Sequence, residues 1–327
     1  MLRAFFASKK WFLWAYGGGT VLFLLLYAQV SVSVKFNEWY GGFYDILQKT
    51  GEHTFDDFYQ KLVEFTWLAI LAIIIASITN YLTRLYAFYW RKAITFDYIP
   101  RWRTVEKELE GASQRIQEDA RAFAKIVESL GLKTIRALMT LAAFLPILWA
   151  LSEGITIKFL EGVPGSLVWT ALLVSLGGTI ISWFVGIKLP GLEYNNQRVE
   201  AAFRKELVYG EDDKAHHASF ETLAELFTGI QFNYHRLFLH YGYFDLWANL
   251  YNQIMVVVPF VIAGPALFSG AITLGTLIQI SNAFGKLENS FGIFIDNWTT
   301  VTELRSIWKR LREFETNLLT HAVSAKS

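Results

Sequence analysis

The chain has 327 residues, of which 53% are hydrophobic, 17% are aromatic and only 18% are charged. A soluble domain carries about a quarter charged residues, so this composition lacks the polar surface of a water-soluble protein. It also excludes a disordered or collagen-like chain, and the lack of cysteine excludes a disulfide-stabilised secreted fold. The formal net charge of +1 gives no reason to expect nucleic acid as a partner.

Six stretches are long and apolar enough to form transmembrane helices, because a bilayer core needs about 20 apolar residues in a helix. They cover residues 11–34, 62–89, 132–151, 163–187, 243–267 and 272–298. The first is too long for the hydrophobic region of a cleaved signal peptide. The last two carry polar side chains, which we expect to face a bundle interior or a watery cavity. These are Asp245, Asn249, Asn252, Gln253, Gln279, Asn282, Lys286, Glu288 and Asp296.

The distribution of Lys and Arg predicts the orientation of these spans. The two termini and the connections on their side of the membrane carry 22 basic residues. The connections on the other side carry four, namely Lys35, Lys49, Lys61 and Lys158. Because cytoplasmic loops are enriched in Lys and Arg, we expect both termini to lie in the cytoplasm.

The two longest cytoplasmic connections, residues 90–131 and 188–236, are predicted to be helical hairpins that continue out of the membrane. Residues 192–209 contain no Gly or Pro, which favours an unbroken helix. The outer connections are expected to be short, apart from residues 35–61, and residues 303–315 form a final amphipathic segment. Residues 1–327 are therefore predicted to be one all-α membrane domain.

Sequence motifs of enzymes are absent from the chain. It contains no G-x-S-x-G, no H-E-x-x-H and no P-loop, and residues 270–276, the nearest to a P-loop, lack the lysine. His216 and His217 are adjacent and cannot chelate a metal as an i, i+4 pair does, so we expect them to be solvated. We therefore expect no enzymatic activity, metal or cofactor. Since little chain follows residue 318, we expect energy from a partner ATPase or from an ion gradient.

Acidic residues recur on one face of the second predicted hairpin. At 100° per residue, Glu193, Glu200 and Glu211 lie within about 20° of one another. Gln197 and Arg204 lie on the same stripe.

In the first hairpin, Glu118 and Glu128 are about 80° apart on a helix, and Arg115 is placed to pair with Glu118. Spacing alone leaves two interpretations of all these carboxylates. One is a solvated helix face with salt bridges. The other is a ladder of carboxylates lining a cavity, where desolvation and neighbouring negative charge raise their pKa values.

Several stretches of the sequence resemble the SbmA/BacA bacterial peptide transporters. The most specific is KLPGLEYNNQRVEAAFRKELVYGEDD at residues 188–213. The others are EGASQRIQED (110–119), MTLAAFLP (139–146), WYGGFYD (39–45), NWTTVTE (297–303) and KRLR (309–312). Longer members of that family begin with an extra hydrophobic helix, for which we expect no room in this chain.

The resemblance implies a domain-swapped homodimer in the bacterial inner membrane, with a fold similar to the membrane domain of ABC exporters but without their ATPases. It implies proton-gradient-driven uptake of peptides, including antimicrobial peptides and peptide-like antibiotics. Protons would be the coupling ion, membrane lipid the surroundings, and no nucleotide would bind. The family's glutamate ladder maps onto Glu118, Glu128, Glu200 and Glu211. Weaker or supporting candidates are Arg115, Glu193, Arg204 and Glu206.

Two alternatives remain open at this stage. The chain could be the membrane domain of a half-transporter that recruits a separate ATPase for lipids or very-long-chain fatty acids. It could also be a membrane scaffold whose hairpins dock partners, in which case the polar residues of the last two spans would tolerate apolar substitution.

Overall fold

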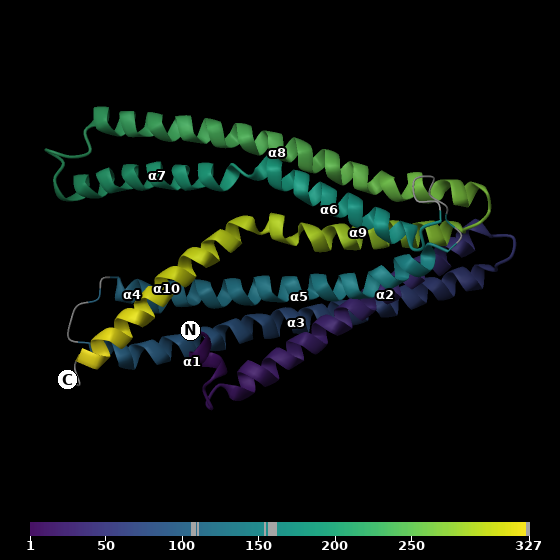
Figure 1. Ribbon diagram of the computed structural model, residues 1–327, viewed down its shortest axis with the longest axis horizontal. Helices are drawn as coiled ribbons and strands as arrows, with labels where there is room; N and C mark the ends of the chain where they lie inside the picture. The colour runs from purple at the N-terminus through teal and green to yellow at the C-terminus, as the bar shows by residue number, and fades with distance from the viewer. Residues whose placement is uncertain (106–108, 110, 154, 156–161, 325–327) are drawn as a thin grey trace. The chain divides into compact units, whose positions relative to one another are not determined.

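The computed structural model describes residues 1–105, 109, 111–153, 155 and 162–324, and regular structure in this part of the chain is helical (Figure 1). The elements in chain order are α1 (Leu2–Phe6), the π-helical turn η1 (Leu13–Gly18), α2 (Gly19–Gln48), α3 (Phe55–Arg103), α4 (Ala112–Gln114), the π-helical turn η2 (Arg115–Asp119), α5 (Ala120–Leu151), α6 (Ser166–Gly186), α7 (Leu189–Asp212), α8 (Phe220–Phe268), α9 (Leu274–Asp296) and α10 (Trp298–Ser324).

Five helical segments of the described chain are long and apolar enough to cross a membrane. They run over Leu13–Gln48, Phe55–Arg103, Ala112–Leu151, Ser166–Asp212 and Phe220–Phe268. They overlap the first five predicted spans and confirm an α-helical, multi-pass membrane protein. The sixth predicted span coincides with α9, which is not among the five, so the count of six stays a prediction.

Several of these helices are much longer than a bilayer is thick. α3 and α8 have 49 residues each, which at 1.5 Å per residue is about 74 Å. The hydrocarbon core is only about 30 Å thick, so both helices continue beyond it. Within the described residues, α3 continues to Arg103, helix resumes at Ala112, and α7 and the first part of α8 cover most of residues 188–236. The two predicted hairpins and their placement in the cytoplasm stay predictions.

The long connection expected at residues 35–61 is mostly helical, because α2 continues to Gln48 and α3 already begins at Phe55. A capping box starts α3: the Thr54 hydroxyl accepts from the Asp57 N–H, and the Asp57 carboxylate accepts from the Thr54 N–H at 2.8 Å. The indole of Trp39 donates to the carbonyl oxygen of Lys61 at 2.8 Å and ties the two helices together. Local capping therefore shortens the connection to six residues, 49–54.

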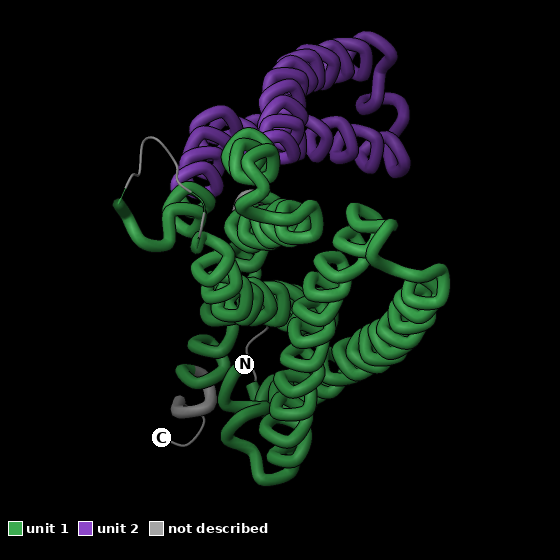
Figure 2. Tube along the Cα trace, turned by 90° about the vertical axis from the view of Figure 1, so that its right-hand side faces the viewer, with its two compact units in different colours: residues 1–172, 259–327 green, residues 173–258 purple. Residues whose placement is uncertain are grey.

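The chain divides into two compact units (Figure 2). Unit 1 comprises Met1–Leu172 and Pro259–Ser327, and unit 2 comprises Leu173–Val258. In unit 1, α2, α3, α5 and α9 pack against one another, while unit 2 holds most of α6, all of α7 and most of α8. The prediction of one domain over residues 1–327 stays a prediction.

The core of unit 1 is built around the amphipathic α10, as predicted for residues 303–315. Its buried stripe has the 3.6-residue period of a helix and consists of Ile307, Leu311, Phe314 and Leu318. These side chains join one apolar cluster with Ile94, Tyr98 and Phe123 of α3 and α5. α10 is thereby held against the C-terminal part of α3 and the N-terminal part of α5.

Candidate functional site

The predicted site residues form two groups, one in each unit. The group in unit 1 lies in η2 and the first part of α5 and consists of Arg115, Glu118 and Glu128. The group in unit 2 lies on α7 and consists of Glu193, Glu200, Arg204, Glu206 and Glu211. Each group is described within its own unit.

The strongest polar arrangement in unit 1 centres on Asp119, which the sequence did not single out. Its side chain is buried, with 4% of the residue exposed. Arg310 of α10 donates from Nε to Oδ2 at 3.0 Å and from Nη2 to Oδ1 at 2.7 Å. Arg115 donates from Nη1 to Oδ2 at 2.9 Å. Three charge-assisted hydrogen bonds therefore satisfy one buried carboxylate and join α10 to η2.

The predicted pairing of Arg115 with Glu118 is wrong, because Arg115 pairs with Asp119 instead. Asp119 is four residues after Arg115 and Glu118 is three, so helical spacing allows either pair, and burial of Asp119 against Arg310 decides between them. Asp119 points into the protein, where two guanidinium groups meet it, while Glu118 is exposed. The hydrogen bond to Asp119 raises the pKa of Arg310, so this residue stays charged.

Glu118 and Glu128 occupy different environments. Glu118 is exposed, whereas Glu128 is buried with 7% of the residue accessible. The Oε1 atom of Glu128 has no hydrogen-bond partner among the described residues. Since a buried negative charge without a partner is unfavourable, this carboxyl group is suited to bind and release a proton.

α7 carries the predicted acidic stripe as one continuous helix from Leu189 to Asp212. Glu193 and Glu200 are half-buried, and Glu211 is exposed in the last turn. From Glu193 to Glu211 the stripe extends over about 27 Å along the helix axis. Glu193 also lies close enough to Tyr241 of α8 for an electrostatic interaction. The helical premise of the ladder is confirmed, and its function stays a prediction.

Glu206, a weaker candidate, shapes the connection between α7 and α8. Its Oε1 accepts the backbone N–H of Ala218 at 2.9 Å and lies 3.6 Å from Nδ1 of His217. Ala218 has a left-handed backbone with φ +56°, which this contact holds in place. Glu206 therefore has a structural role in the turn of unit 2.

Asp213 starts the same turn. Its Oδ2 lies 2.8 Å from Nδ1 of His216, and its Oδ1 accepts the backbone N–H groups of Ala215 and His216. These hydrogen bonds, led by the one to His216, hold the pKa of Asp213 below its usual range. His216 and His217 contact carboxylates of the turn, and both side chains are exposed, as the sequence predicted.

The remaining acidic candidates share one property, the absence of a cationic neighbour. Within the described part of the chain, no Lys, Arg or His nitrogen lies within 4.0 Å of the carboxylate oxygens of Glu118, Glu128, Glu193, Glu200 or Glu211. This does not fit the interpretation as a face laced with salt bridges. These five carboxylates are therefore without a salt-bridge partner in the described part of the chain.

The polar residues of the last two predicted spans divide between the units. In unit 1, the Gln279 side chain donates to the carbonyl oxygen of Asn37 in α2 at 3.2 Å, which confirms that it faces the interior. In unit 2, α8 leaves a polar set exposed on this chain. The set consists of Asp245, Asn249, Asn252 and Gln253.

Among the described residues, no group of three or more His, Asp or Glu side chains is arranged to hold a metal ion. Two residues used in the sequence predictions, Glu110 and Lys158, lie outside the described residues.

Comparisons with known proteins point to membrane transporters. The sequence model of the SbmA/BacA-like family matches residues 8–319. The inner membrane ABC transporter ATP-binding protein YddA of Escherichia coli is 28% identical over 317 residues, which are 90% of this chain and 56% of that protein. ABC transporter D family member 2, chloroplastic, of Arabidopsis thaliana is 23% identical over 309 residues, 90% of this chain and 42% of that protein. The chain spans about half the length of the curated relatives it matches.

Proposed function

Because this chain belongs to the SbmA/BacA-like family of membrane transporters, we propose that it imports peptides across the bacterial inner membrane, driven by the proton gradient. The cargo class includes antimicrobial peptides and peptide-like antibiotics. The chain acts as a homodimer with both termini in the cytoplasm. It performs no chemical reaction and needs no nucleotide or cofactor other than the coupling proton.

The observation that carries this proposal is the set of carboxyl groups without a cationic neighbour, above all Glu128. Its side chain is buried and one of its oxygens has no hydrogen-bond partner among the described residues. Burial without a partner favours the neutral acid, and entry of water or of a cationic peptide favours the carboxylate. A group of this kind converts a change in hydration into binding or release of a proton.

A symmetric partner would complete the transport pathway. α8 exposes Asp245, Asn249, Asn252 and Gln253 on a single chain, within the span predicted at residues 243–267, where contact with lipid would be unfavourable. A second copy would cover such a polar face and enclose an aqueous route between the two chains. Acidic walls along that route would attract cationic peptides.

The energy available from the proton gradient is sufficient to drive a conformational change of the transporter. One elementary charge that crosses a potential of 100 mV supplies about 2.3 kcal/mol, and each pH unit adds about 1.4 kcal/mol. A change of about 1.4 kcal/mol in the free-energy difference between two states already changes their equilibrium constant tenfold. Protonation of the glutamates would therefore bias an outward-facing to inward-facing transition that is near balance.

The test is uptake of a labelled cationic peptide by proteoliposomes that hold the purified chain, with an imposed inward proton gradient and no ATP. We expect uptake by the wild type, and its loss in Glu118→Gln, Glu200→Gln and Glu211→Gln with normal expression and dimerisation. The matched control is Glu313→Gln, because that side chain is 62% exposed on α10. Full uptake by all three ladder variants would refute the ladder mechanism.

A second candidate is an ATP-powered transporter of lipids or very-long-chain fatty acids. It is favoured by the names of the relatives, which describe ATP-binding transporters, and by the match of this chain to only about half of their length. In the same proteoliposomes, no peptide uptake under the gradient would favour this candidate. Peptide uptake without ATP would exclude ATP hydrolysis as the source of energy.

A further inference from the structure

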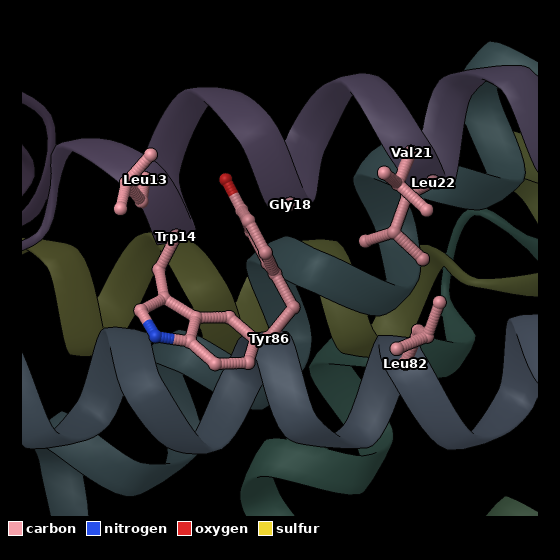
Figure 3. A pocket seen from close by; sticks show the side chains of 7 residues that line it. All are labelled: Leu13, Trp14, Gly18, Val21, Leu22, Leu82 and Tyr86. Carbon is pink, nitrogen blue, oxygen red and sulfur yellow. The ribbon is translucent and has the colours of Figure 1, made fainter.

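An apolar cavity of about 390 Å³ lies between α3 and the segment formed by η1 and the start of α2, in unit 1 (Figure 3). Trp14 and Tyr86 lie toward one end of it, and Val21, Leu22 and Leu82 toward the other. Its volume falls within the range of ligand pockets, about 300–1,000 Å³. The cavity is distant in the sequence from every glutamate considered above and plays no part in the proposed transport mechanism.

The local backbone and its contacts hold the walls of this cavity in place without a bound ligand. η1 is a π-helical turn, and such turns recur at functional sites. The hydroxyl of Tyr86 donates to the carbonyl oxygen of Ala15 in this turn at 3.0 Å. A Cβ at Gly18 would lie 3.2 Å from the Tyr86 ring, so glycine allows the ring to lie close to the helix. The indole of Trp14 is fixed by stacking on Tyr89, with ring centroids 3.9 Å apart.

The cavity opens to the outside of the chain at a membrane-facing helix. Leu13 at its rim is 80% exposed and Val21 is 45% exposed, both within a segment apolar enough to cross the membrane. We expect this rim to face lipid hydrocarbon, because both residues lie in the span predicted at residues 11–34.

Two lysines stand immediately before the cavity in the chain. Lys9 and Lys10 are exposed in the turn that leads into η1. The ammonium group of Lys10 lies 5.5 Å from the centre of the Trp11 ring, and Trp11 itself is buried, so the turn is anchored. An apolar slot whose first lining residue, Leu13, follows the second of two exposed lysines by three residues is complementary to a molecule with a hydrocarbon chain and an anionic headgroup.

We infer that this cavity binds an anionic phospholipid of the surrounding bilayer. One acyl chain lies in the cavity between η1 and α3, and the ammonium groups of Lys9 and Lys10 hold the phosphate of the headgroup. Trp14 and Tyr86 lie at the headgroup end of the acyl chain, where amphipathic aromatic side chains are favoured in membranes.

The test uses the delipidated full chain in detergent, titrated with phosphatidylglycerol or with phosphatidylcholine of the same acyl chains, and native mass spectrometry to count bound lipid. We expect phosphatidylglycerol to bind roughly tenfold more tightly, because each lysine near an anionic lipid contributes to the affinity. Inorganic phosphate should not compete, since it lacks the acyl chain. Equal affinity for the two lipids, or competition by phosphate, would overturn the inference.

Two variants separate the headgroup from the acyl chain. Lys9→Gln with Lys10→Gln should abolish the preference for phosphatidylglycerol, whereas the matched pair Lys92→Gln with Lys125→Gln, also exposed in unit 1, should keep it. A preference that survives loss of Lys9 and Lys10 would contradict the inference.

Val21→Trp fills the cavity from its exposed rim and should weaken binding of both lipids. The control is Leu24→Trp, which is 58% exposed on the same helix and does not line the cavity. If Val21→Trp instead lowered the fraction of dimer and left lipid binding unchanged, the cavity would be covered by a second copy and the inference would be wrong. Lipid binding and the fraction of dimer are both measured without peptide uptake. A failure of this inference is therefore distinguishable from a failure of the proposed function.

Discussion

Arg310 and Asp119 are joined by two parallel hydrogen bonds, although 191 residues separate them in the chain. They belong to two of the stretches that resemble the transporter family, residues 309–312 and 110–119. The fold thus brings these two stretches together, and the contact fixes α10 to the beginning of α5. Arg115 adds a third hydrogen bond to the same carboxylate.

Replacement of Arg310 tests this contact. Arg310→Lys keeps the positive charge but loses the forked geometry, so we expect a loss of about 1 kcal/mol in the free energy of unfolding. Arg310→Ala leaves Asp119 with Arg115 alone and should cost about 2 kcal/mol, less than for a fully buried pair because Arg310 is 35% exposed. Denaturant titration in detergent micelles measures both, and Lys309→Ala should change stability by less than about 0.5 kcal/mol. An equal effect of Lys309→Ala would contradict the role of the contact.

The turn of unit 2 offers a pair of coupled substitutions. A Cβ at Gly210 would overlap the Cβ of Ala218, so Gly210→Ala should destabilise the protein by about 1–3 kcal/mol. Ala218→Gly removes the overlapping atom and relieves the left-handed backbone at φ +56°. The double variant should therefore recover most of the loss, which a double-mutant cycle in the same titration measures. Additive effects of the two substitutions would show that the two residues do not touch.

The hydrogen bonds of Asp213 predict that the stability of the turn between α7 and α8 depends on pH. Its pKa is lowered by hydrogen bonds from His216 and from backbone N–H groups, so the ionised carboxylate stabilises the turn. This stabilisation is complete above the unfolded value of about 3.9 and is lost as the pH falls through the lower folded pKa. Hydrogen-exchange protection of the Ala215 and His216 amides, corrected for intrinsic rates, should fall in this acidic range. In Asp213→Asn the protection should be low and independent of pH, and an unchanged profile would contradict the assignment.

The orientation of the spans can be tested with single cysteines, because the chain contains none. Glu52→Cys lies in the connection between α2 and α3, and Lys214→Cys and Lys309→Cys lie on the side predicted to be cytoplasmic. In intact cells a membrane-impermeant maleimide should label only Glu52→Cys, and permeabilised cells should show labelling at all three positions. Labelling of Lys214→Cys or Lys309→Cys in intact cells would reverse the predicted orientation.

Hydropathy and periodicity were sufficient to predict most of the helices, because membrane spans and amphipathic faces are properties of local sequence. The stripe from Ile307 to Leu318 and the continuous α7 are examples. The start of α3 was missed because the capping box of Thr54 and Asp57 begins the helix in a polar stretch, and the continuation of α2 to Gln48 was missed because only apolar residues were counted.

The site was less predictable. Helical spacing offers Arg115 both Glu118 (i, i+3) and Asp119 (i, i+4), and only the fold shows that Asp119 is the buried one. Arg310 and Asp119 are far apart in the chain, so spacing gave no signal for their contact. Glu206 belongs to the acidic helix by sequence, but the fold engages it in the turn at Ala218.

Coupling of peptide entry to proton entry is tested most directly by the internal pH of proteoliposomes that contain a trapped pH-sensitive dye. Under an inward proton gradient, added peptide should cause acidification with the wild type and with Glu313→Gln, and none with Glu128→Gln. Peptide entry without acidification in the wild type, or normal acidification with Glu128→Gln, would contradict the proposed mechanism.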